Sequence, residues 1–117
     1  MKPVTVLLAD DHRIVAEGLK RLLEPEFELI GVVEDGRALL AAARELQPDV
    51  IVSDISMPEL NGVEALEELK KLIPEVRVVF LTMHHNVAYA RQAMAAGALG
   101  YVLKHSAAEE LILAVRA

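Results

Sequence analysis

The sequence predicts a doubly wound α/β domain, with a five-stranded parallel sheet and helices on both of its faces. Short apolar runs alternate with longer amphipathic stretches five times along the 117 residues. The short runs are apolar at nearly every position, which is typical of parallel strands buried on both faces. The longer stretches repeat apolar residues at helical spacing, so each can form the right-handed crossover between two parallel strands.

The expected strands are short runs bounded by polar or turn-forming residues. β-branched side chains, which favour strands, stand at the start of the first run. The five runs, in chain order, are Val4–Ala9, Leu29–Val33, Val50–Ser53, Val76–Leu81 and Leu99–Leu103.

The expected helices follow the strands and stop at residues that terminate helices. Pro25, Pro48 and Pro74 follow the first three helices, and Gly97 is well placed to cap the fourth. Ser106 can serve as the N-cap of the fifth. Their apolar faces run through Ile14–Leu23, Leu39–Leu46, Val63–Ile73, Val87–Ala96 and the residues after 106. Because the fifth pattern is still apolar where the sequence stops, we expect residues 1–117 to be a truncated piece of a longer protein.

The composition excludes several classes of function. The chain has no cysteine, so it cannot form a disulfide framework, a thiolate zinc site, an iron–sulfur cluster or a cysteine nucleophile. Its 12 basic and 18 acidic side chains give a net charge of −6, which argues against direct nucleic-acid binding. The uncharged runs are too short to cross a bilayer, and the N-terminus does not have the pattern of a secretory signal. We therefore expect a soluble, cytoplasmic protein that does not contact membranes.

Polar side chains follow four of the expected strands. They are Asp10 and Asp11, then Asp54, Thr82 and Lys104. Ligands of open α/β sheets bind beyond the carboxyl ends of the strands. Three carboxylates in one crevice repel each other, so they call for a cation unless one of them is protonated. Oxygen ligands favour Mg²⁺ or Mn²⁺, and the lysine and hydroxyl are donors suited to a phosphoryl group. The pattern predicts phosphoryl chemistry with one carboxylate as the nucleophile.

Four stretches in this order carry a resemblance to a known family: VLLADDH, VSDISMPELNG, FLTM and GYVLK. The chain from Val4 to Ala117 resembles the receiver domain of two-component response regulators. The segments LTMHHN and GYVLK are most similar to the NarL/FixJ subfamily, whose members usually carry a C-terminal LuxR-type helix-turn-helix. The resemblance implies a flavodoxin-like fold of strand order 2-1-3-4-5. It also implies that residues 1–117 form one receiver domain, cut before its output domain.

The resemblance implies a role for each acidic residue of the crevice. Asp54 would be the phospho-acceptor and one of the residues that hold Mg²⁺, and Asp11 would bind the ion directly. Asp10 would act on the ion partly through water, and the backbone carbonyl of Ser56 would complete the protein's share of the metal shell. Such a domain is a signalling module that catalyses its own phosphorylation and dephosphorylation, not an enzyme acting on a separate product.

The resemblance also assigns the remaining polar residues. Thr82 would hydrogen-bond a phosphoryl oxygen, and Lys104 would pair with the phosphoryl charge. Tyr101 falls at the family's switch aromatic, which would turn inward as Thr82 moves. Where many relatives have proline, this chain has His105, so we expect a trans peptide bond there.

The implied partners follow from this chemistry. A sensor histidine kinase or a small phosphodonor would phosphorylate Asp54 in a Mg²⁺-dependent step. Phosphorylation would then shift the face formed by the fourth helix, fifth strand and fifth helix, which controls an output, expected to be transcription. Phosphorylation-dependent homodimerisation is a further expectation, and DNA would be contacted only through the output domain.

Three alternative interpretations remain open from the residues alone. An aspartyl-phosphate phosphohydrolase of the haloacid dehalogenase kind uses similar groups, but it places its nucleophile in an Asp-x-Asp pair after the first strand. The chain could also be an interaction module that keeps the fold without phosphorylation. Finally, Asp10 and Asp11 could serve only as the N-cap and dipole-stabilising acid of the first helix. The histidines His12, His84 and His85 fit no common zinc spacing, so we expect them to be solvated loop residues.

Overall fold

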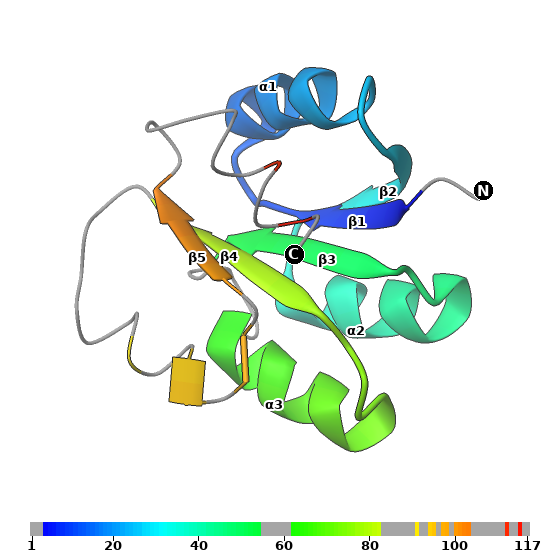
Figure 1. Ribbon diagram of the computed structural model, residues 1–117, viewed down its shortest axis with the longest axis vertical. Helices are drawn as coiled ribbons and strands as arrows, with labels where there is room; N and C mark the ends of the chain where they lie inside the picture. The colour runs from blue at the N-terminus through cyan, green and yellow to red at the C-terminus, as the bar shows by residue number, and fades with distance from the viewer. Residues whose placement is uncertain are drawn as a thin grey trace.

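The computed structural model of the chain describes residues 4–54, 62–82, 91, 94–95, 97–98, 100–103, 112 and 115. Their elements follow the order β1 (Thr5–Ala9), α1 (Arg13–Leu23), β2 (Glu28–Val33), α2 (Gly36–Leu46), β3 (Val50–Asp54), α3 (Gly62–Leu72), β4 (Val78–Thr82) and β5 (Gly100–Leu103). The strands pair in parallel in the order β2-β1-β3-β4-β5, so the expected doubly wound sheet is confirmed in the described residues. Figure 1 shows α1 on one side of this sheet and α2 with α3 on the other.

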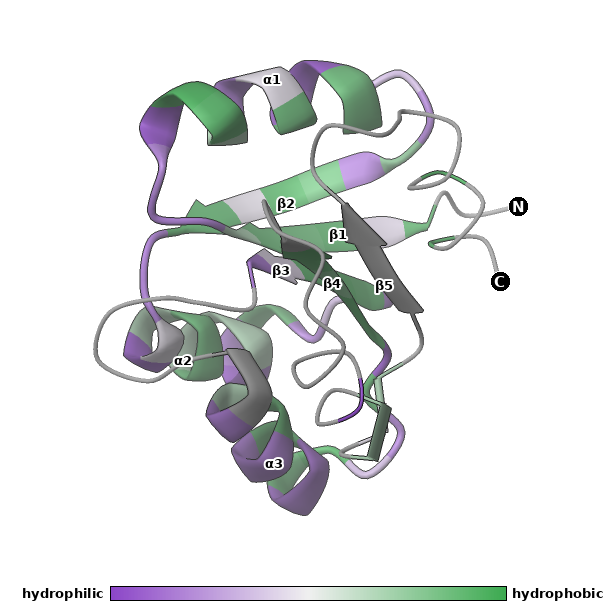
Figure 2. Ribbon diagram, turned by 90° about the vertical axis from the view of Figure 1, so that its left-hand side faces the viewer, coloured by the Kyte–Doolittle hydropathy of each residue, from purple (hydrophilic) through white to green (hydrophobic). Residues whose placement is uncertain are grey.

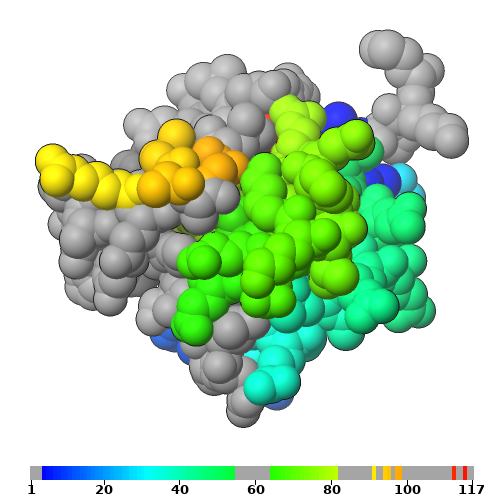
Figure 3. Space-filling view, turned by 90° about the horizontal axis from the view of Figure 1, so that it is seen from below, coloured from blue at the N-terminus to red at the C-terminus, as the bar shows by residue number. Residues whose placement is uncertain are grey.

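The strands β1, β3 and β4 are buried on both faces, since successive residues of each strand point to opposite sides and both sides are covered. In β4, Phe80 packs into a core with residues of α2 and α3, whereas Val79 and Leu81 pack into a core with residues of α1. Hydrophobic and hydrophilic residues alternate along the ribbons of α1, α2 and α3 (Figure 2), as expected of helices with one buried face. The side chains of α2 and α3 lie next to each other on the second face (Figure 3).

Each expected strand has at least one boundary that is wrong by one or two residues. β4 begins at Val78 and not at Val76, because the Val76 N–H donates to the Ile73 carbonyl oxygen (3.0 Å) and holds that residue in a turn. β3 continues one residue further than expected, to Asp54, so this acid belongs to the strand itself. The backbone of Asp54 is thereby held in the ladder of the sheet, where it pairs with Leu81.

The expected helices at 87–96 and after 106 lie largely outside the described residues. Arg91, Met94 and Ala95 are helical in the first of them, as are Ile112 and Val115 in the second. Gly97 has a φ of 98°, and its N–H donates to the Met94 carbonyl oxygen (3.1 Å). This conformation is suited to glycine and agrees with the expected cap at the end of the fourth helix. No helix in the described part of the chain is long and apolar enough to span a membrane.

Asp35 caps the N-terminus of α2, a role that the sequence pattern did not reveal. Its Oδ1 accepts the Ala38 N–H at 2.7 Å, which satisfies one of the amides that a helix start leaves without a partner. We expect Asp35→Ala to lower the free energy of unfolding by about 1 kcal/mol in chemical denaturation. Asp35→Asn is the matched control because asparagine caps about equally well. Equal losses in the two variants would contradict the capping role.

Candidate functional site

Two neighbouring strands bring the acidic residues together at the carboxyl edge of the sheet. β1 and β3 pair in parallel with Ala9 opposite Ser53, so the residues that follow, Asp10 and Asp54, lie next to each other. The Asp10 N–H donates to the Val33 carbonyl oxygen (2.9 Å), which ties this residue to the end of β2 as well. The Ser53 hydroxyl donates to the Asp54 carbonyl oxygen at 2.9 Å. The main chain on both sides of the acid pair is therefore held by hydrogen bonds.

The two acids are buried. Asp10 is 1% exposed and Asp54 is 4% exposed, and within the described residues they are the buried charged side chains. Taking a carboxylate out of water is costly unless a positive charge or several hydrogen-bond donors face it. Asp11 is less deeply placed, and its side chain is 28% exposed. Its Oδ1 is nevertheless buried, and its 3.0 Å contact with His12 Nδ1 is an ion pair that lacks the geometry of a hydrogen bond.

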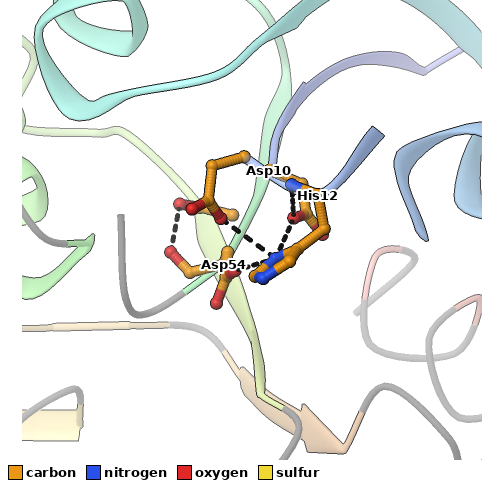
Figure 4. A network of polar contacts seen from close by, with 5 residues as sticks. Asp10, His12 and Asp54 are labelled. Carbon is orange, nitrogen blue, oxygen red and sulfur yellow. Dashed lines mark hydrogen bonds and ion pairs between the residues drawn. The ribbon is translucent and has the colours of Figure 1, made fainter. Parts of the chain in front are cut away.

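The imidazole of His12 lies among these carboxylates. Its Nδ1 is 3.2 Å from Asp10 Oδ1, 3.0 Å from Asp11 Oδ1 and 3.6 Å from Asp54 Oδ2. Figure 4 shows the ring nitrogen turned toward the carboxylates of Asp10 and Asp54. His12 is a solvated loop residue, as expected, with a side chain that is 57% exposed, but its Nδ1 also contacts the carboxylates. Counting the spacing between histidines could not reveal this, because the groups that surround the ring are carboxylates.

A local turn explains the position of His12. Asp10 Oδ1 accepts the backbone N–H of His12 at 2.9 Å, a two-residue side-chain turn that aspartate forms readily. His12 is also the N-cap residue of α1, whose first turn contains no acidic residue. The interpretation of one of the two acids as the N-cap of this helix is therefore wrong, because His12 holds that position. The two acids face the crevice instead.

Some of the other expected site residues lie within the described part of the chain, and the others do not. Thr82 is the last residue of β4 and pairs with Leu103 of β5, so its main chain lies at the same edge of the sheet. Tyr101 lies in β5 opposite Phe80. Ser56 and Lys104 lie outside the described residues, as do His84, His85 and the expected trans bond before His105.

The acidic residues and the imidazole at this edge of the sheet are suitable ligands for a divalent cation. Asp10, Asp11, His12 and Asp54 each offer one ligand atom, and these four atoms lie within 4.8 Å of one another. Three carboxylates in so small a space repel each other, and a cation between them would remove that repulsion. The buried Asp11 Oδ1 that accepts no hydrogen bond from the described residues also fits an ion in this position. The crevice is therefore an acidic cluster that could hold a metal.

A comparison with known protein families shows to which family this chain belongs. The model of the family described as the response regulator receiver domain matches residues 6–116. The chain belongs to this family. The receiver-domain resemblance of its motifs is therefore confirmed, whereas the phosphohydrolase interpretation has no support.

Individual proteins that are similar to this receiver domain agree with the family assignment. It is 41% identical over 115 residues to the transcriptional regulatory protein DegU of Brevibacillus brevis, covering 97% of this chain and 49% of that protein. The receiver domain thus spans about half the length of the curated relatives it matches. The signal receiver domain of the putative regulator NarL from Mycobacterium tuberculosis has a TM-score of 0.93 at 30% identity, covering 99% of this chain and 95% of that one.

A LuxR-family response regulator from Aurantimonas sp. SI85-9A1 is also similar in structure. Its TM-score is 0.93 at 35% identity, and the match covers 98% of this chain and 84% of that one. Together with the DegU and NarL similarities, this places the receiver domain among response regulators of the NarL and LuxR type.

Proposed function

We propose that this receiver domain accepts a phosphoryl group on Asp54 in a Mg²⁺-dependent reaction. The observation that carries the proposal is the convergence of the Asp10, Asp11 and Asp54 carboxylates at the end of two adjacent strands. Asp54 stands between the acids that follow β1 and the end of β4, because β3 lies between those two strands. A phosphoryl group on Asp54 would therefore lie between a bound ion and the last residue of β4, Thr82.

The reaction uses this chain's own groups as follows. A carboxylate oxygen of Asp54 forms a bond to phosphorus while the bond between phosphorus and the donor breaks, and the donor keeps the electron pair. Asp10 and Asp11, with the backbone carbonyl of Ser56, would hold the Mg²⁺ ion, for which Mn²⁺ could substitute. When bound, the ion neutralises charge that develops on the phosphoryl oxygens. Thr82 and Lys104 would bond those oxygens after transfer, and Tyr101 would follow Thr82 as the switch aromatic.

The partners and output are part of the same proposal. The phosphoryl donor would be a sensor histidine kinase in the cytoplasm, or a small phosphodonor in its absence, and the domain would catalyse both its own phosphorylation and its dephosphorylation. The relatives are named as transcriptional regulators and are about twice as long as the matched region. We therefore propose a C-terminal helix-turn-helix output domain that contacts DNA. Phosphorylation would shift the face around β5, and homodimerisation would accompany that shift.

The proposal is tested by intact-mass measurement after incubation with acetyl phosphate and Mg²⁺. We expect the wild-type chain to gain one phosphoryl group, and to gain none when the ion is chelated. Asp54→Asn should gain none because its amide is not a nucleophile of this kind. Glu34→Gln is the matched control, since Glu34 is an exposed acid that follows β2 at the same edge of the sheet. Equal incorporation into wild type and Asp54→Asn would overturn the assignment.

A further inference from the structure

The imidazole Nδ1 of His12 lies as far from the carboxylate oxygens as two ligand atoms of one metal ion lie from each other. For an ion with ligand bonds of about 2.1 Å, adjacent ligand atoms are about 3.0 Å apart in an octahedron and about 3.4 Å apart in a tetrahedron. The separations of Nδ1 from the three carboxylate oxygens are 3.0, 3.2 and 3.6 Å. These three separations fit two ligands of one ion, and the 3.2 Å contact with Asp10 is also a hydrogen bond that a metal would replace.

The main chain holds His12 in this position. Its N–H donates to Asp10 Oδ1 at 2.9 Å, and its carbonyl oxygen accepts the Ala16 N–H at 2.8 Å as the first bond of α1. Both polar groups of the residue's backbone are thus satisfied by fixed neighbours. Only the side-chain torsions of His12 have to stay fixed for the ring to remain directed at the acids. The side chain therefore loses little conformational entropy when a metal binds.

We propose that His12 is a metal ligand through Nδ1, and that the site therefore also binds borderline ions such as Co²⁺ and Zn²⁺. This inference rests on the proposed function for the presence of a metal at the acids. Imidazole is a preferred ligand of Zn²⁺ and of other late transition metals, whereas Mg²⁺ prefers oxygen and keeps its waters. The nitrogen should consequently contribute to the binding of Co²⁺ and Zn²⁺ and contribute little to that of Mg²⁺.

The test is calorimetric titration of the whole 117-residue chain with CoCl₂, ZnCl₂ and MgCl₂ separately, for wild type and His12→Ala. We expect the substitution to weaken Co²⁺ and Zn²⁺ binding by about tenfold or more, the size of effect seen for groups that support a metal site. Mg²⁺ affinity should stay close to wild type. The visible absorption of bound Co²⁺ should also change, because its band positions and intensities depend on nitrogen ligation.

Two further variants control for general effects. Arg13→Ala changes the next residue, an exposed side chain whose Nε pairs with Glu34 Oε1 at 3.1 Å, and should leave all three affinities unchanged. His12→Asn keeps a polar side chain at the N-cap and should lose Co²⁺ and Zn²⁺ affinity as the alanine variant does. Circular dichroism checks that each variant is folded.

The outcomes separate this inference from the proposed function. Tighter binding of every ion to His12→Ala would show that the ring competes with metals, and equal losses for Mg²⁺ and Co²⁺ would show a general charge effect. Either result would overturn the role of His12 as a ligand while wild type still gained a phosphoryl group with Mg²⁺. Selective loss of Co²⁺ and Zn²⁺ affinity in a chain that gains no phosphoryl group would overturn only the proposed function.

Discussion

Replacing Asp11 by asparagine is expected to weaken Mg²⁺ binding by about tenfold or more, since even groups that only support metal ligands contribute about that much. The same change should make the metal-free protein more stable. Asp11 Oδ1 is within 4.8 Å of the ligand oxygens of Asp10 and Asp54, and removing one of three like charges relieves repulsion. Function and stability would therefore move in opposite directions at this residue.

Two measurements check this prediction. Calorimetric titration with MgCl₂ gives the affinity, and denaturation with a chelator present gives the stability of the metal-free chain. Glu34→Gln makes the same chemical change at the same edge of the sheet and should alter neither value greatly. Mg²⁺ affinity that stays at the wild-type value in Asp11→Asn would remove this carboxylate from the metal site. A loss of stability without metal would show that its charge is not repelled by its neighbours.

Replacing Phe80 by alanine is expected to lower the free energy of unfolding by about 3–5 kcal/mol. Phe80 is fully buried in β4, where it packs with residues of β1, β3, α2 and α3. Its removal leaves a cavity that a sheet fixed on both sides can fill only in part. Because small domains are stable by about 5–15 kcal/mol, this loss is a large fraction of the total.

Urea denaturation of Phe80→Ala measures the effect, with Ile14→Ala as the control. Ile14 lies in the first turn of α1 and is 90% exposed, so its truncation should change stability by no more than about 0.5 kcal/mol. Similar losses in the two variants would mean that burial does not determine the stability of this domain. A loss below about 1 kcal/mol in Phe80→Ala would mean that the core collapses around the missing ring.

The fold could be predicted from local patterns because the patterns agree with the tertiary structure. Strands such as Val50–Asp54 are buried on both faces, so their sequences are apolar almost throughout. The prolines after the first three helices mark where those helices can no longer continue. The start of β4 shows the largest difference, two residues, because the turn bond of Val76 depends on the position of Ile73 in space and leaves no mark in composition.

The acidic part of the site could be predicted for a related reason. Parallel strands end at a common edge, so residues at strand ends such as Asp10 and Asp54 must converge whatever lies between them. The position of His12 could not be predicted in this way. It depends on a side-chain turn at Asp10 and on the rotation of one ring toward three carboxylates. Spacing rules that count only histidines and cysteines do not describe such a group.

The placement of Asp54 inside the ladder also limits how the domain can respond to a new charge. Asp54 pairs with Leu81, and the preceding Ser53 is aligned with both Ala9 and Phe80. Shifting this stretch of main chain would disturb three strands and both hydrophobic layers at once. The sheet therefore serves as a rigid frame of reference, and any change of shape on modification is confined to segments beyond the strand ends. Such a frame could be combined with different outputs without being redesigned.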